Sequence, residues 1–252
     1  MPPKIAQLVI ACLLPLVLAG QERDLDWVLD RYVDAAGGRA NLSDISSVVI
    51  EGTVTTGESP PVAIKVMKKR PNLVRQVMNY PDGRRFTLAF DGTQAWQMQS
   101  TQRKDHFELL DYDANHPFLR DAELENPLAA EVFDKRLMKY HGIVKIEGNI
   151  NCHYIEVNYP DGSNSHFYID EQTFLERKTV KEQPTEDGTM EVTEVFPSDF
   201  RFHNGVLFSH RLIIRPANGP NSLLEIDSIR INAGVSGTFF KPPPGEAKAV
   251  GE

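Results

Sequence analysis

The regular patterning of the chain begins with one helical segment. From Asp24 to Ala36, apolar residues recur at the spacing of one helical face, and Gly37-Gly38 ends the run. The positions of this face are Leu25, Val28, Leu29, Tyr32, Val33 and Ala36. The opposite face is acidic, which argues against a helix lying on an anionic membrane surface. We therefore expect an amphipathic helix that covers a sheet.

From Ser46 onward, apolar and polar residues alternate with the period of two that is typical of half-buried strands. Turn residues such as Pro81-Asp82-Gly83 and Asp91-Gly92 separate five such segments. Their apolar rows are Val48, Ile50, Gly52 and Val54; Val62, Ile64 and Val66; Leu73 and Val77; Phe86, Leu88 and Phe90; and Trp96 and Met98. Each of these strands is expected to have one dry face and one wet face.

A helical interruption is predicted between Asp113 and His141. Asn126 as N-cap, Pro127 at the first helical position and Gly142 beyond the end frame a helix. Its apolar face would be Ala129, Val132, Phe133, Leu137 and Tyr140, and Pro117 to Leu119 indicate a shorter helical turn before it. Alternation then resumes in seven segments, at about 143–149, 152–159, 165–170, 174–180, 190–196, 206–214 and 223–231.

Tight turns are sufficient to link these segments, so the sheet should be antiparallel and strongly coiled. The sequence Asn79-Tyr80-Pro81-Asp82-Gly83 recurs unchanged at residues 158–162. A duplicated hairpin and independent use of the same turn chemistry both account for the repeat.

The first twenty residues have the features of a secretory signal: Lys4, an apolar run from Ile5 to Leu18, and small residues ending at Ala19. The run is about fourteen residues, shorter than the roughly twenty of a helical membrane span. Cys12 follows Val9-Ile10-Ala11 like a lipobox cysteine, but it lies too early in the run for lipid attachment. We expect a signal peptide at 1–20, one domain at 21–245 and a disordered stub at 246–252, in an exported protein.

The net charge is −8, and removal of Lys4 with the signal makes it −9, which argues against nucleic acid as a partner. Cys152 would be the only remaining cysteine, so no internal disulfide is expected. It lies in a strand-like run, where a packed small residue is favoured over a catalytic thiol. The common catalytic motifs are absent from the sequence. His203 and His210 flank a turn at Asn204-Gly205, but a zinc site needs further ligands, so we expect no metal or cofactor.

A coiled sheet of about a dozen strands either closes tightly on its helices or keeps an apolar cavity. If a cavity exists, the residues expected to line it are Val66, Val77, Phe86, Leu88, Phe90, Trp96, Met98, Val132, Phe133 and Leu137.

Three segments carry a resemblance to a known family: Lys69-Arg70-Pro71-Asn72-Leu73, Asp91-Gly92 followed by Trp96, and Phe239-Phe240 followed by Pro242-Pro243-Pro244-Gly245. In order and approximate spacing they resemble the LolA family of periplasmic lipoprotein carriers. The resemblance implies an incomplete, half-open antiparallel β-barrel of about 11–12 strands, with an N-terminal helix and a helical lid over an apolar cavity. Arg70 matches the family arginine that holds the lid closed through lid backbone, and Trp96 matches a cavity-wall tryptophan.

The function implied by this resemblance is non-enzymatic: a monomeric carrier would bind acyl chains of lipoproteins or lipids and pass them from an inner-membrane donor protein to an outer-membrane acceptor protein. The chain is longer than usual for the family, and its lid segment is more charged, with Arg120, Asp121, Glu123 and Glu125. Two alternatives therefore stay open. One is an envelope-stress sensor of the same fold that binds a membrane protein's periplasmic segment, and the other is a secreted hydrolase.

Overall fold

The computed structural model describes residues 24–112, 116–120, 122–131, 133–185 and 187–244. Two helices, α1 (Leu25–Ala35) and α2 (Arg39–Ser43), precede the strands, and three short helical turns follow: α3 (Pro117–Arg120), η1 (Lys135–Leu137) and η2 (Gly237–Phe240). The expected signal peptide, Cys12 and the C-terminal stub lie outside the described residues. Within the described residues, no helix is both long and apolar enough to span a membrane.

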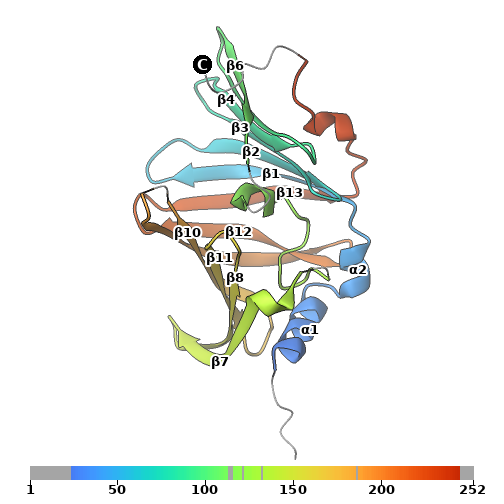
Figure 1. Ribbon diagram of the computed structural model, residues 1–252, viewed down its shortest axis with the longest axis vertical. Helices are drawn as coiled ribbons and strands as arrows, with labels where there is room; N and C mark the ends of the chain where they lie inside the picture. Colours follow the sequence, from blue (N-terminus) through green and yellow to red (C-terminus); the bar gives the residue numbers. More distant parts are fainter. Residues whose placement is uncertain (1–23, 113–115, 121, 132, 186, 245–252) are drawn as a thin grey trace, which may run out of the picture.

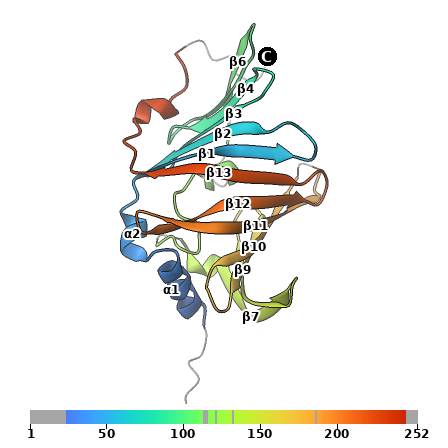
Figure 2. The ribbon, with the colours of Figure 1, turned by 180° about the vertical axis from the view of Figure 1, so that it is seen from behind.

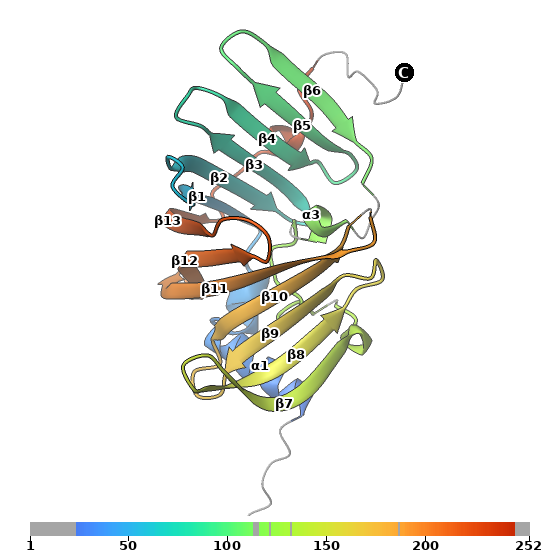
Figure 3. The same cartoon turned by 90° about the vertical axis from the view of Figure 1, so that its left-hand side faces the viewer.

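Thirteen strands form one antiparallel sheet that does not close into a barrel. The strands are β1 (Ser47–Thr56), β2 (Val62–Lys69), β3 (Leu73–Asn79), β4 (Arg85–Phe90), β5 (Ala95–Ser100), β6 (Asp105–Leu110), β7 (Met138–Ile146), β8 (Ile150–Asn158), β9 (Asn164–Asp170), β10 (Glu176–Pro184), β11 (Met190–His203), β12 (Val206–Pro216) and β13 (Ser222–Ile231). Their order is β6-β5-β4-β3-β2-β1-β13-β12-β11-β10-β9-β8-β7, with the two edge strands at opposite ends of the molecule (Figure 3). The expected incomplete antiparallel barrel with an N-terminal helix is confirmed.

Helix α1 forms as its pattern predicts. The carboxylate of Asp24 caps the helix by accepting a hydrogen bond from Trp27 N at 2.8 Å. Val28, Leu29 and Val33 are the buried residues of the helix. Figures 1 and 2 show α1 beside the end of the sheet that holds β7, and η2 beside the end that holds β6.

The two faces of the sheet carry different partners, because successive strand residues point to opposite sides. Val48 packs with α1, α2 and Ala129 on one side, whereas its neighbour Val49 packs with Val235 and Phe240 on the other. We call the first side the inner face and the second the outer face. The strand register carries these assignments from one strand to the next.

Both copies of the repeated turn sequence close hairpins with the same hydrogen bonds. Tyr80 N donates to Arg84 O at 2.9 Å in the β3–β4 turn, and Tyr159 N donates to Ser163 O at 2.9 Å in the β8–β9 turn. Gly83 and Gly162 have φ values of 86° and 82°, the left-handed region that glycine enters without strain.

The predicted helix from Asn126 to His141 is wrong. The side chain of Asn126 does cap a turn, accepting from Leu128 N at 3.0 Å and Ala129 N at 3.3 Å, but the helix does not continue. Met138 to Ile146 instead pairs with β8, with a register shift between Tyr140 and Ile143. The alternation of this segment matches a pleated surface, and pairing with β8 outweighs its local helix signals. The shorter turn at Pro117 is confirmed as α3.

Candidate functional site

Residues 116–120 and 122–131 run over the inner face, and we call them the crossing segment. Phe118, Leu119 and Ala122 pack on a buried cluster that includes Val74 and Phe90. Further along, Leu124 and Ala129 pack over β1 and β13. The crossing segment therefore covers one end of the inner face, at the level of the first residues of β1 and the last residues of β4.

Arg70 ties the crossing segment to the helices and the sheet. Its Nε donates to Ile45 O at 2.6 Å, one Nη donates to Leu42 O at 3.3 Å, and the same nitrogen pairs with the carboxylate of Glu125. A guanidinium has five donors in a rigid fork, so it can bind several acceptors at once. The contact with the crossing segment is made through a side-chain carboxylate, and the backbone carbonyls that Arg70 binds belong to α2 (Leu42) and to the α2–β1 connection (Ile45).

Two other cations hold backbone carbonyls of the crossing segment. Lys68 Nζ donates to Glu123 O at 3.0 Å, and Arg39 donates to Ala129 O. Sequence reasoning missed both of these contacts. The position of Lys68 next to the Lys69-Arg70 pair was the available signal.

The start of the crossing segment is tied to the β8–β9 turn. Arg120 donates to Asp161 Oδ2 and to Ser163 Oγ, both at 2.7 Å, and its guanidinium lies 4.1 Å from the Tyr159 ring centroid. Burial by itself would raise the pKa of Asp161, but hydrogen bonds from Arg120 and Ser163 outweigh it, so the pKa is lowered. The carboxylate is therefore ionised over the whole physiological range.

This tether predicts a stability that depends on pH. A carboxyl with a lowered folded pKa contributes above its unfolded pKa of about 3.9 and loses that contribution as the pH falls through the folded value. We expect Arg120→Gln to lower the free energy of unfolding by about 1 kcal/mol at pH 6 and by less at pH 2.5, measured by urea unfolding. The stacking on Tyr159 does not titrate and is lost at both pH values.

Arg136→Gln is the matched control, because Arg136 pairs with Asp134 while its own side chain is 89% exposed. It should change stability little at either pH. An equal loss for Arg120→Gln at pH 6 and pH 2.5 would show that the Asp161 tether does not stabilise the fold.

Beyond the crossing segment, the inner face carries a continuous set of half-buried apolar side chains, which we call the apolar patch. It extends over the seven adjacent strands from β4 through β1 and β13 to β11. Its members are Ile50, Val54, Val62, Ile64, Val66, Met78, Phe86, Leu88, Val195, Leu212, Ile214, Leu224 and Ile226. Contiguous apolar surface that stays partly accessible is typical of a binding site.

The ten residues predicted to line a cavity separate into groups. Val66, Phe86 and Leu88 belong to the apolar patch, and Phe90 lies next to it under the crossing segment. Val77, Trp96 and Met98 point to the outer face, because their register partners are Lys65, Ala89 and Thr87. Phe133 packs over β7 to β9, Leu137 lies in η1, and Val132 lies outside the described residues. The structure therefore brings only four of the ten together.

Trp96 is a packed residue of the outer face. It is 1% exposed, its Nε1 donates to Phe240 O at 2.8 Å, and Arg75 lies 5.5 Å from its ring. Phe240 is itself fully buried. Trp96 therefore anchors the C-terminal segment that contains η2 on the outer face.

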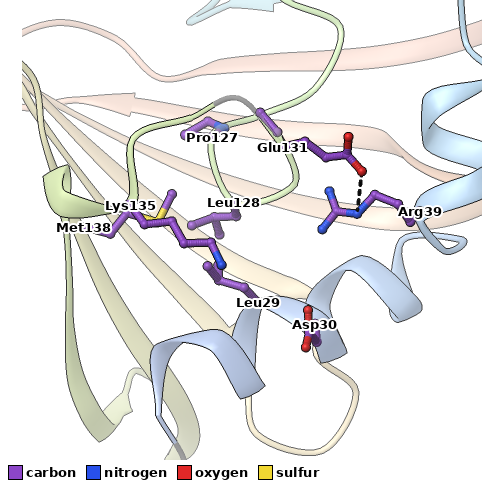
Figure 4. A pocket seen from close by; sticks show the side chains of 9 residues that line it. Leu29, Asp30, Arg39, Pro127, Leu128, Glu131, Lys135 and Met138 are labelled. Atoms are coloured by element: carbon purple, nitrogen blue, oxygen red, sulfur yellow. Dashed lines mark ion pairs between the residues drawn. The ribbon is translucent and has the colours of Figure 1, made fainter.

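A pocket of about 210 Å³ opens between α1, the crossing segment and the start of β7 (Figure 4). Its lining is Leu29, Asp30, Arg39, Pro127, Leu128, Ala130, Glu131, Lys135 and Met138, and we call it the α1 pocket. A second pocket of about 200 Å³ lies near the β7–β8 turn and includes Phe196 and Arg215. Both are smaller than the roughly 300–1,000 Å³ of typical ligand sites.

The residues considered for catalysis, Cys152, His203 and His210, make contacts that are typical of packed structural residues. Burial and the neighbouring Asp170 raise the pKa of Cys152 to about 11, so the thiol is protonated at neutral pH and is a poor nucleophile. His203 and His210 do converge, with their Nε2 atoms 2.8 Å apart, and His210 Nδ1 donates to Ile226 O at 2.8 Å. Burial and the nearby His210 lower the pKa of His203. Among the described residues, no group of three or more potential metal ligands occurs.

Scans of the sequence against protein-family models and against curated proteins give no match. Among solved structures, the chain is similar to a DUF1329 family protein from Desulfovibrio piger, with a TM-score of 0.57 and 13% identity over 86% of this chain and 97% of that one. It is also similar to a LolA superfamily protein from Nitrosomonas europaea, with a TM-score of 0.55 and 12% identity over 86% of this chain and 97% of that one. At these identities the similarity concerns the fold. The open sheet, the N-terminal helix and these two structures together establish that the chain has a LolA-like fold.

Proposed function

We propose that this protein is a non-enzymatic periplasmic carrier that binds acyl chains of lipoproteins or lipids on the apolar patch. The observation that carries the proposal is the patch itself, which joins seven strands of the inner face and ends at the crossing segment. The signal-like N-terminus supports the periplasmic location.

A hydrocarbon chain suits this surface better than a peptide does. The backbone groups of the central strands are already paired in the sheet ladder, and the patch side chains are apolar. A peptide buried there would leave its own backbone groups without partners, at a cost of roughly 1–3 kcal/mol for each one. An acyl chain has no such groups and gains about 0.8 kcal/mol for each buried methylene.

We assign the described conformation, in which the crossing segment is tied to the helices and the sheet, to the closed state of this carrier. Four cations hold the crossing segment in place: Arg70, Lys68, Arg39 and Arg120. The two pockets described above are lined by none of Val66, Phe86, Leu88 and Phe90. Loading of an acyl chain as far as Phe90, which lies under the crossing segment, therefore requires that segment to move. The polar ties lost on opening offset part of the gain from burying the acyl chain, which makes later release feasible.

Native mass spectrometry of the periplasmically expressed protein tests the proposal directly. We expect a fraction of the protein to carry one or more acylated molecules, released as fatty-acid-containing species on denaturation. Protein that is free of bound lipid after mild purification, and that also fails to bind a fluorescent fatty acid, would refute the carrier function.

Weakening the latch should strengthen binding. Glu125→Gln removes the ion pair with Arg70 but leaves the bonds from Arg70 to Ile45 and Leu42 intact. Because only the closed state loses an interaction, the open fraction rises, and we expect the affinity for a fluorescent fatty acid to rise about three- to tenfold. Equilibrium titration and stopped-flow release measure the change.

Glu123→Gln is the matched control, because the crossing segment is held there through the backbone carbonyl of Glu123. It should leave the affinity close to that of the wild type. If Arg70→Leu also has unchanged affinity and release rate, Arg70 has no part in the mechanism.

We also propose that a donor protein of the inner membrane loads this carrier and that an acceptor protein of the outer membrane receives its cargo. The regulatory alternative, a sensor that binds a membrane protein's periplasmic segment, predicts a stable complex in a pull-down. The hydrolase alternative predicts that alanine at Cys152, His203 or His210 abolishes the phenotype of the protein, and we expect these variants to keep it.

A further inference from the structure

The α1 pocket combines charges of both signs with an apolar floor (Figure 4). Arg39 and Lys135 supply two cations, and Asp30 and Glu131 supply two carboxylates. We infer that this pocket binds a zwitterionic lipid headgroup, one that contains a phosphate and a primary ammonium group. The inference rests on the function proposed above, and it specifies the class of lipid carried.

The ion pairs of the pocket are available for exchange with a ligand, and Arg39 makes its ion pair through a different nitrogen from the one that holds Ala129 O. Arg39 pairs with Glu131 at 3.5 Å, with side chains 41% and 64% exposed, and Lys135 pairs with Asp26 at 2.5 Å, also at the surface. Exposed ion pairs of this kind are weak in water. A phosphate can therefore replace the carboxylate partners of the two cations, and guanidinium geometry favours phosphate oxygens.

Asp30 supplies the complementary site for the ammonium group. Its carboxylate has no hydrogen bond or ion pair within the part of the chain that the structure describes, and it borders the pocket from α1. Glu131 becomes free for the same role when Arg39 turns to a phosphate. An anionic headgroup without an amine would leave these two carboxylates unpaired, in a protein whose net charge is already −8.

The floor of the pocket leads toward the acyl-chain surface. Leu29, Leu128 and Met138 are almost fully buried and belong to the apolar cluster over β7 to β9. The next residue, Ala129, belongs instead to the cluster of Val48 and Ile229, which borders the apolar patch. The turn of the crossing segment at residues 126–130 thus separates the two regions. When that turn moves away from the sheet, the pocket joins the inner face. One lipid can then place its headgroup in the pocket and its acyl chains on the inner face.

The test uses three soluble lipids with identical dioctanoyl tails: phosphatidylethanolamine, phosphatidylglycerol and dioctanoylglycerol. Each is titrated against the full protein with a bound fluorescent fatty acid, and displacement is measured. We expect the phosphoethanolamine lipid to displace the probe at about fivefold lower concentration than either of the others, the effect of about one exposed ion pair.

Two variants locate the preference in the pocket. Asp30→Asn should reduce the preference over phosphatidylglycerol, because Glu131 remains as a second carboxylate, and Lys135→Gln should reduce the preference over dioctanoylglycerol. Asp34→Asn lies one turn further along α1 and Lys139→Gln lies on β7, both exposed and outside the pocket lining, and both should keep the wild-type preferences.

Equal displacement by the three lipids would overturn the headgroup site while leaving the acyl-chain carrier intact. A preference that both pocket variants leave undiminished would also overturn it. If the fatty-acid probe itself does not bind, the carrier function fails, and the headgroup inference fails with it.

Discussion

An Ile64→Asp variant is expected to lose affinity for a fluorescent fatty acid by about a hundredfold, or about 3 kcal/mol. Ile64 lies near the middle of the apolar patch, between Gly52 of β1 and Met78 of β3. In the empty protein the half-buried position leaves a carboxylate partly hydrated, so the fold should tolerate the change. In the complex an acyl chain would displace that water without supplying a hydrogen bond.

The matched control is Ala63→Asp on the preceding residue. Ala63 is exposed and points to the outer face, so the same charge on the same strand should leave the affinity unchanged. Fluorescence titration of the two variants beside the wild type gives the comparison. Similar losses for both, or no loss for Ile64→Asp, would place the ligand elsewhere.

The second large effect concerns stability alone. We expect Trp96→Ala to lower the free energy of unfolding by about 3–5 kcal/mol, because it removes a fully buried aromatic side chain and leaves the carbonyl of Phe240 without its donor. Urea unfolding followed by circular dichroism measures the loss. The affinity for a fatty acid should not change in the folded protein, since Trp96 faces away from the apolar patch.

Two further variants make this result decisive. Phe239→Ala removes a neighbouring side chain that is 53% exposed, and it should cost little stability. Trp96→Phe keeps most of the buried volume and should fold well while losing the bond to Phe240. A folded Trp96→Phe protein with weaker fatty-acid binding would show that Trp96 contributes to the ligand site.

Local patterns predicted most of the elements. The spacing from Asp24 to Ala36 and the glycines after it are sufficient for α1, because capping and one apolar face act within a few turns of chain. Alternation and turn residues likewise located the strands, whose number rose from the expected eleven or twelve to thirteen. The failure at residues 126–141 came where local helix signals met a distant partner, β8, that no short window of sequence contains.

The register between neighbouring strands decided which apolar residues share the inner face. Val77, Trp96 and Met98 are as apolar as Val66 and Leu88, and alternation shows only which residues of one strand share a face. A shift of one residue in the pairing of neighbouring strands moves a whole row to the opposite side. Moreover, both sides of β5 are covered, by the crossing segment and by the C-terminal segment, so apolar character does not distinguish them.

The sequence by itself determined the antiparallel β architecture and the leading helix, and it showed that Arg70 offers donors for several bonds at once. These follow from interactions between residues close in the chain and from the donors of one side chain. Only the tertiary structure decided which apolar rows share the inner face, that Glu125 is the partner of Arg70 in the crossing segment, and that the α1 pocket gathers four charges. Such features depend on contacts between segments far apart in the chain, and the packing of the whole sheet sets their geometry.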